Sequence, residues 1–254
     1  MGDNLKNSLV SIVTPVHNGE DFFAETIRTV LSQSYTSWEW IIVDDGSTDK
    51  TLDIIKEHKS KKIKIIESQG NNGAAKSRNK GIKASNGDFL CFLDADDLWE
   101  PKKIEKQINF MKEKDCAFSF TSYEFADSFG NPNGKIVSVP AKISYEQALK
   151  NTTIWTSTVM FDMKKLSKEE VTMPDVWRGQ DTATWWKVLK KIDCAYGLNE
   201  VLSYYRRGRA SLSSNKFTAL KRTWNLYRNV ERFGIVKSMM YFVAYCFNAV
   251  RRRI

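Results

Sequence analysis

The feature that most limits the possible folds is a regular alternation of apolar runs and helical repeats before residue 100. Four apolar runs have the length of buried strands: 9–14, 38–43, 62–66 and 88–93. Three segments between them repeat apolar residues at helical spacing: 22–31, 48–59 and 74–84. Strands that alternate with helices through short connections predict a mostly parallel sheet with helices on both faces. The expected fold class is therefore α/β and Rossmann-like.

The second half of the chain is less regular. The expected helices are 101–114, 145–150 and 181–192, and the expected strands are 116–123, 135–139, 155–161 and 201–205. An Asn-Pro-Asn-Gly turn at 131–134 predicts a hairpin.

Polar motifs directly follow three of the predicted strands. Thr14-Pro15 follows the first strand, Asp44-Asp45 the second, and the motif that starts at Asp94 the fourth. In parallel sheets of this kind, ligands bind beyond the carboxyl ends of the strands. We therefore expect these motifs to converge on one ligand site.

The acidic motif Asp94-Ala95-Asp96-Asp97 places three carboxylates within four residues. Like charges this close raise one another's pKa unless a cation is present. A divalent cation bound to a diphosphate would offset the repulsion, so the motif predicts a metal site. The alternative is an acidic turn that caps the next helix.

Two further segments have the chemistry of a nucleotide site. An acid at Asp44 or Asp45 can accept hydrogen bonds from a base or a ribose, although Asp-Gly-Ser-Thr is also a good turn and helix cap. The turn 70–73 precedes a helix that carries Arg78, and backbone amides with a guanidinium suit a phosphate.

Four stretches resemble the family 2 glycosyltransferases of the GT-A fold, including those of bacterial O-antigen and capsule polysaccharide. They are Val10–Asn18, Ile42–Asp49, Ala75–Gly81 and Phe92–Asp97. The match is specific over residues 8–125 and continues weakly to about residue 214. His17 stands where the family commonly has Tyr.

The resemblance implies an inverting transfer of a sugar from a UDP-sugar, assisted by Mn²⁺ or Mg²⁺, so that an α-linked donor gives a β-linked product. It implies that Asp96 holds the metal, Asp94 contacts the ribose, and Asp44 or Asp45 reads the base. The donor-binding residues expected on this basis are Thr14, Pro15, Asp44, Asp45, Arg78, Asp94, Ala95, Asp96, Arg206 and Arg209. The two arginines belong to 204–213, which resembles a loop that closes over the diphosphate; a solvated basic loop is the alternative.

Inversion needs a general base on the acceptor side. The stretch Arg178–Trp186 matches the family's base motif, with Gln180 in place of the usual Glu, and makes Asp181 the candidate base. The alternative is a helix N-cap or an acid in the first turn of a helix, which the helix dipole favours. Trp155, Thr156 and Trp177 are weaker candidates for an acceptor site, because aromatic faces stack on sugars.

The chain carries a formal charge of +9, and residues 216–254 hold nine basic residues and one acid, a net +8. Within this tail, the apolar run 239–247 is too short to cross a bilayer. An apolar run among basic residues suits an interfacial helix on anionic lipid, and the alternative is a helix that docks on the domain. The expected organisation is a catalytic domain at 1–214, with a nucleotide-sugar half at 8–125 and an acceptor half at 126–214, followed by a basic amphipathic helical tail at 215–254.

Two other functions compete with sugar transfer. A nucleotidyltransferase would use similar acids but would need a glycine-rich basic loop after the first strand, which 14–19 does not provide. A non-enzymatic lipid- or nucleic-acid-binding protein would leave the acidic strand ends unexplained. The expected partners are therefore a UDP-sugar and a glycan or polyprenyl-diphosphate-linked sugar, with no nucleic acid. The expected location is cytoplasmic and peripheral, at the inner face of the cytoplasmic membrane.

Overall fold

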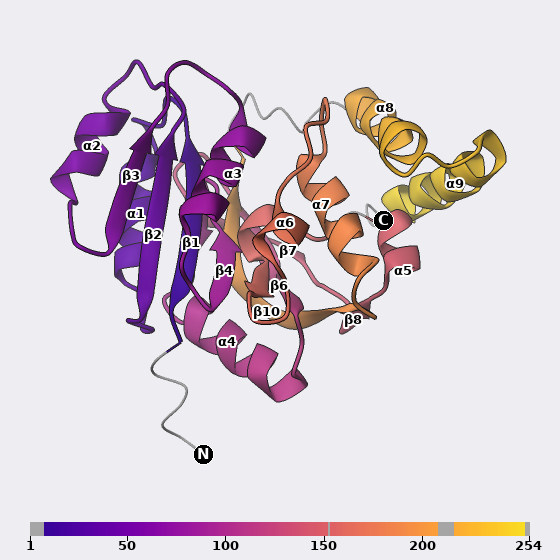
Figure 1. The fold of residues 1–254 in the computed structure, drawn as a ribbon, viewed down its shortest axis with the longest axis horizontal. Coiled ribbons are helices and arrows are strands. Elements are labelled where there is room, and N and C mark those ends of the chain that lie inside the picture. The colour runs from indigo at the N-terminus through magenta and orange to yellow at the C-terminus, as the bar shows by residue number, and fades with distance from the viewer. Residues whose placement is uncertain (1–7, 152, 208–215, 252–254) are drawn as a thin grey trace.

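A computed structural model describes residues 8–151, 153–207 and 216–251 (Figure 1). Its centre is one mixed sheet of ten strands, in the order β3-β2-β1-β4-β9-β6-β10-β5, with β7 beside β6 and β8 beside β10. The predicted α/β fold class is thereby confirmed. Both predicted halves of the catalytic domain contribute strands to this one sheet.

The N-terminal half of the sheet is parallel, as expected. Its strands are β1 (Val10–Val16), β2 (Trp38–Asp44), β3 (Ile63–Glu67) and β4 (Phe89–Phe92). The helices between them are α1 (Phe23–Leu31), α2 (Thr51–Glu57) and α3 (Ala74–Ala84). Since β1 is buried on both sides, alternate residues serve two cores: Ile12 packs with α1, and Val13 packs with α3. Gly81 allows α3 to approach β1, because a Cβ there would lie 2.3 Å from Val13.

The C-terminal half of the sheet is mixed. Its strands are β5 (Leu98–Trp99), β6 (Phe118–Ala126), β7 (Pro132–Val137), β8 (Lys142–Ile143), β9 (Met160–Asp162) and β10 (Ala195–Arg206). Its helices are α4 (Lys103–Lys114), α5 (Tyr145–Leu149), α6 (Lys168–Val171) and α7 (Gln180–Leu189). Strands β6 and β10 run parallel to each other, and β9 lies antiparallel between β4 and β6. Strands β6 and β7 form a hairpin, as predicted, but the predicted turn position is wrong: the turn lies at 127–131, and Pro132–Gly134 belong to β7.

The strand predicted at 155–161 is wrong in its first half. Residues 156–158 form a short 3-10 helix, η1 (Thr156–Thr158), and the strand β9 starts only at Met160. The reason lies in side-chain bonds: the Thr158 hydroxyl donates to the Trp155 carbonyl at 2.7 Å, and the Ser157 hydroxyl donates to Asp97. These bonds coil the segment toward the acidic motif.

In its described residues, 216–251, the tail forms two helical pieces. α8 (Lys216–Asn225) continues into a π-helical turn, η2 (Leu226–Val230), and α9 (Ile235–Arg251) follows after a turn. Figure 1 shows both pieces at the edge of the molecule away from β1–β3, beside α5 and α7. No helix in the described ranges is both long enough and apolar enough to cross a membrane.

Candidate functional site

The acidic motif forms a tight turn between β4 and β5 that distant side chains hold in shape. The Thr26 hydroxyl of α1 donates to the carbonyls of Ala95 and Asp97, at 2.7 and 3.0 Å. The Asp94 amide donates to the Ser157 hydroxyl at 3.0 Å, and the Asp97 amide closes the turn on the Asp94 carbonyl at 3.0 Å. The direction of each carboxylate is therefore set by the fold.

Asp97 is the structural acid of the motif. It is fully buried, and it accepts hydrogen bonds from the Trp155 indole at 2.8 Å and from the Ser157 hydroxyl. Burial, and then the charges of Asp96 and Asp94, raise the pKa of Asp97 well above its usual value, although both hydrogen bonds act in the opposite direction. An acid so enclosed by protein donors stabilises the turn and is not available to a ligand.

Asp96 fits a metal ligand better than its two neighbours. Asp94 is paired with Arg78 and Asp97 is enclosed, whereas no side chain of the described residues bonds the Asp96 carboxylate. Burial, followed by the charge of Asp94, raises the pKa of Asp96 to about 6. A hard cation would remove this cost, and carboxylate oxygen is the donor that Mg²⁺ and Mn²⁺ prefer. The described residues contain no group of three or more His, Cys, Asp or Glu that could hold a metal alone, so a cation here would need ligands from a bound diphosphate or water.

The Asp44-Asp45 pair shapes the neighbouring loops. Asp44 is buried, and one carboxylate oxygen accepts from the Gly46 and Ser47 amides, each at 3.1 Å. Asp45 accepts from the Asn72 and Gly73 amides at 3.0 and 2.7 Å. Burial acts to raise the pKa of Asp45, but these amide donors outweigh it and lower that pKa. Asp45 is therefore a stable anion at the entry to α3.

Helix α3 connects the acidic groups of the sheet edge. Its N-terminal Gly73 is held by Asp45, and Arg78 forms an ion pair with Asp94, both side chains being largely buried. Asn79 exchanges two hydrogen bonds of 2.8 Å with the backbone of Met173, in the segment that leads to α7. This role of Asn79 could not be predicted from the sequence, because nothing in the local pattern indicates a partner 94 residues away.

Asp181 lies in the first turn of α7. The helix starts after Gly179, which has φ 83° and gives the helix no side-chain cap. Among the described residues, none forms a hydrogen bond or ion pair with the Asp181 carboxylate, which is only partly buried. Figure 1 shows the start of α7 on the same side of the molecule as the start of α3 and the carboxyl ends of β1–β3. The predicted base and the predicted donor residues thus belong to elements that converge at one rim.

Arg206 is almost fully enclosed by the protein. The guanidinium is 6% exposed and all three of its nitrogens donate within the protein. The acceptors are the Asp96 carbonyl at 2.9 Å, the Ser128 carbonyl at 3.1 Å and the Glu25 carboxylate at 2.5 Å. Arg206 therefore holds the Asp96 carbonyl of the acidic turn in place, and its predicted contact with a diphosphate stays a prediction. Arg209, the other predicted arginine, lies outside the described residues.

Arg206→Ala is expected to lower the free energy of unfolding by about 2–4 kcal/mol, because it leaves Glu25 and two carbonyls without their donor. Arg206→Lys should recover little of this, since one ammonium cannot reproduce the three-way fork. Urea denaturation followed by circular dichroism measures both. The control is Arg207→Ala, at an exposed neighbour. Equal stability of Arg206→Ala and Arg207→Ala would contradict the supporting role and restore a ligand role.

The remaining predicted residues divide into buried and exposed groups. The Thr14 hydroxyl is fully buried and accepts from the Trp40 indole at 2.9 Å, and Pro15 is buried beside it on β1. Trp155 stacks on Tyr205 with ring centres 4.1 Å apart, and Thr156 is 3% exposed. Trp155 is partly buried and the other three side chains are buried, and a ligand role for each of the four stays a prediction. Trp177, in contrast, is 55% exposed. The Arg178 guanidinium and the Lys221 ammonium lie 5.2 and 5.5 Å from the centre of its ring.

Comparison with known proteins decides the family. The model named "Glycosyl transferase family 2" matches residues 11–170, which is more than half of the chain. The chain belongs to glycosyl transferase family 2. This membership makes it a glycosyltransferase, and it decides against both the nucleotidyltransferase and the non-enzymatic alternatives.

Two relatives cover nearly the whole of this family 2 enzyme. It is 44% identical over 248 residues to TuaG of Bacillus subtilis (strain 168), a candidate teichuronic acid biosynthesis glycosyltransferase, covering 97% of this chain and 98% of that protein. It is 36% identical over 223 residues to WfgD of Escherichia coli, a UDP-Glc:alpha-D-GlcNAc-diphosphoundecaprenol beta-1,3-glucosyltransferase, covering 86% and 85%.

A solved structure supports the GT-A fold. The mannosyltransferase PcManGT from Pyrobaculum calidifontis, in complex with GDP-Man and Mn²⁺, superposes with a TM-score of 0.69. The alignment covers 96% of this chain and 74% of that one, at 16% identity. The fold predicted from the resemblance is confirmed at the level of backbone architecture.

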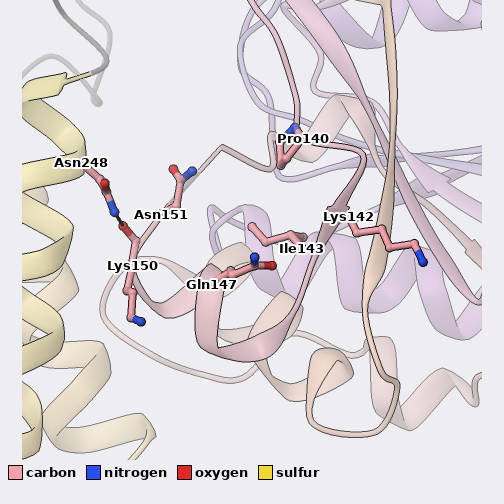
Figure 2. A pocket seen from close by; sticks show the side chains of 7 residues that line it. All are labelled: Pro140, Lys142, Ile143, Gln147, Lys150, Asn151 and Asn248. Atoms are coloured by element: carbon pink, nitrogen blue, oxygen red, sulfur yellow. Dashed lines mark hydrogen bonds between the residues drawn. The ribbon is translucent and has the colours of Figure 1, made fainter.

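A separate pocket of about 480 Å³ lies between β8, α5 and α9 (Figure 2). Its lining includes Lys142, Gln147, Lys150 and Asn151, and Figure 2 shows the Lys142 side chain directed away from Asn151. None of the predicted site residues lines this pocket, so we assign it no part in sugar transfer.

Proposed function

We propose that this enzyme transfers a sugar, with inversion, from a UDP-sugar to a polyprenyl-diphosphate-linked sugar or glycan during assembly of a bacterial surface polysaccharide. The observation that supports it most is the acidic turn at the end of β4, where Asp96 has a pKa of about 6 and no side-chain partner among the described residues. The β-1,3-glucosyltransferase activity of the relative WfgD, with its UDP-Glc donor and diphosphoundecaprenol-linked acceptor, and the teichuronic acid pathway of the relative TuaG favour this donor, this acceptor and the β-linkage.

Donor binding is assigned to the rim between β1 and α3. Asp45 would accept hydrogen bonds from the base or ribose through the carboxylate oxygen that does not bond the Asn72 and Gly73 backbone amides. Asp44 shapes the turn after β2. Asp94 would contact the ribose, with Arg78 holding its carboxylate in place. Thr14, Pro15 and Ala95 would line the site through their backbone, since their side chains are buried.

Asp96 would hold Mn²⁺ or Mg²⁺, which supplies positive charge to the leaving diphosphate. The residues of this chain contribute the remaining stabilisation. Arg206 fixes the Asp96 carbonyl, and Thr26 fixes the carbonyls of Ala95 and Asp97, so the turn does not have to reorganise when negative charge develops.

Asp181 would act as the general base in a single displacement. Its carboxylate takes the proton of the acceptor hydroxyl as the acceptor oxygen bonds to the anomeric carbon. On the opposite face, the bond from that carbon to the diphosphate oxygen breaks, and the UDP leaves with the electron pair. The lack of a described protein partner for Asp181 suits this role, since the base must be free to accept a proton.

The acceptor side would be formed by the segment before α7. Trp177, with the cations Arg178 and Lys221 at its ring, offers a sugar-stacking face beside positive charge that suits a diphosphate. A lipid-linked acceptor would be met at the cytoplasmic face of the membrane, with the basic tail as the contact.

The test is a transfer assay with the full chain. A panel of UDP-, GDP- and dTDP-sugars is offered with Mn²⁺ and a synthetic lipid-diphosphate-linked sugar, and nucleotide release and the anomeric configuration of the product are measured. We expect UDP release only with acceptor and divalent ion, and a β-linked product. Turnover of a GDP- or dTDP-sugar but no UDP-sugar would refute the donor assignment, and an α-linked product would refute inversion.

A further inference from the structure

Helix α9 exposes a continuous apolar surface. Six of its side chains are between 49% and 85% exposed: Ile235, Val236, Met239, Met240, Val243 and Phe247. At 3.6 residues per turn they occupy an arc of about 140° along the helix. Together we call them the α9 stripe. On the surfaces of soluble proteins, exposed apolar residues are normally scattered, so a contiguous stripe indicates a binding surface.

The stripe is not the face by which α9 docks on the domain. On the opposite face Ser238, Tyr241 and Tyr245 are buried, and the Tyr241 hydroxyl bonds Glu146 of α5. Asn248 donates to the Lys150 carbonyl at 3.1 Å, as Figure 2 shows. Phe242 packs edge-on against Trp224 of α8. These contacts fix the orientation of α9 about its own axis, and in this orientation the α9 stripe faces away from the domain.

The charge around the stripe has one sign. From Arg232 to the C-terminus the sequence contains no Asp or Glu. Arg232 and Lys237 are exposed near the start of α9, and Arg251–Arg253 stand at its other end in the sequence. An apolar face that begins beside exposed basic residues, in a sequence that ends in a basic run, matches the interfacial region of an anionic bilayer, where acyl chains lie beneath phosphate headgroups.

We propose that the α9 stripe inserts into the surface of an anionic membrane, with α9 lying in the plane of the interface. This deepens the membrane contact of the tail suggested under the proposed function, and it rests on that function for its purpose. A second copy of the chain is the less favourable occupant. Packing two stripes together would also bring together two tails that each carry a net +8 over residues 216–254.

The tail also touches the start of the helix that carries Asp181. A Cβ on Gly179 would lie 3.0 Å from Leu226 and 3.1 Å from Arg222, so α8 and η2 pack closely on this turn. Lys221 of α8 lies over the Trp177 ring. A bilayer that holds α9 would therefore present its lipid-linked substrate next to the proposed acceptor segment.

The test uses co-sedimentation of the full chain with vesicles. We expect binding to phosphatidylglycerol/phosphatidylcholine vesicles, weakened by salt, and little binding to pure phosphatidylcholine. The variant Val236→Ser/Val243→Ser keeps similar helix propensity and removes two exposed stripe residues, at 85% and 60% exposure. Its affinity for the anionic vesicles should fall about tenfold or more. The matched control, Phe129→Ser, alters a residue that is 78% exposed outside the tail and should bind as the unaltered chain does.

Two results would overturn the proposal. One is an absence of binding to anionic vesicles, or an equal loss in the control. The other is a dimer, seen by light scattering, that the stripe variant alone abolishes; this would assign the stripe to a second copy. Transfer to a short-chain, water-soluble acceptor is measured in parallel, and the stripe variant should retain it. Vesicle binding without any transfer would sink the proposed function and leave this inference standing.

Discussion

Asp96→Asn is expected to abolish divalent-ion-dependent transfer, lowering kcat/KM by about 10³-fold or more, because the amide cannot replace the carboxylate as a charged metal ligand. The same substitution should stabilise the metal-free protein. Burial and Asp94 raise the pKa of Asp96 to about 6, so folding at pH 7.5 requires an ionised, poorly solvated group. Asparagine removes that cost, which is roughly 1–3 kcal/mol.

The pH dependence of this stabilisation has a definite sign. An acid whose pKa is raised in the folded state lowers the free energy of unfolding, and the full loss applies at pH values above that folded-state pKa. As the pH falls through this pKa, protonation of the acid in the folded protein removes the loss. The gain from Asp96→Asn should therefore be complete above about pH 6 and disappear between pH 6 and 4. Urea denaturation in EDTA at pH 7.5 and 5 measures it. Asp115→Asn, at a surface acid, is the control and should change neither activity nor this pH profile. Retained metal-dependent transfer in Asp96→Asn would remove Asp96 from the metal site.

Asp181→Asn is expected to lower kcat by about 10²–10⁴-fold, the usual contribution of a positioned general base. KM for the donor should change little, because the residue is assigned to the acceptor face. The unfolding free energy should also change little, since Asp181 has no described hydrogen-bond or ion-pair partner to lose. Steady-state kinetics with a UDP-sugar and a lipid-diphosphate-linked acceptor measure the first two quantities, and urea denaturation measures the third.

Two other acids serve as controls for Asp181. Asp193, just beyond the end of α7, should tolerate replacement by Asn with full activity. Asp175 lies exposed in the segment before the helix and is the alternative base. If Asp181→Asn kept full transfer while Asp175→Asn lost it, the base would be reassigned to Asp175. Loss in all three variants would indicate a general effect on folding.

The elements of the N-terminal half could be predicted because their signals are local. Helix α3 has the bounds expected from the sequence, and β1 and β2 follow their apolar runs within a residue or two. The segment 155–161 could not be predicted in the same way. Its alternating pattern is typical of a strand, but the Ser157 hydroxyl donates a hydrogen bond to Asp97, which lies 60 residues away in the sequence. Residues 156–158 therefore form a 3-10 helix.

The position of the site in the fold could be predicted from its motifs, but the contacts that each of its residues makes could not. The family resemblance and the strand order placed the acids of β2 and β4 at one rim, and the fold agrees. Arg206 was expected to bind a diphosphate, yet it bonds Glu25, 181 residues away, together with two carbonyls. No contact was predicted for Asn79, which connects α3 to the segment before α7 through two hydrogen bonds with the Met173 backbone.

The α/β order, the family and the position of the acidic motif at a strand end could be inferred from the sequence, because periodicity and motif spacing act over a few residues. The contacts of each acid in that motif depend on the folded chain, because their partners lie far away in the sequence. Asp94 pairs with Arg78, Asp97 is enclosed by Trp155 and Ser157, and Asp96 is partly buried with a raised pKa. Three identical side chains differ in their partners and in their exposure because the groups around them come from distant parts of the sequence.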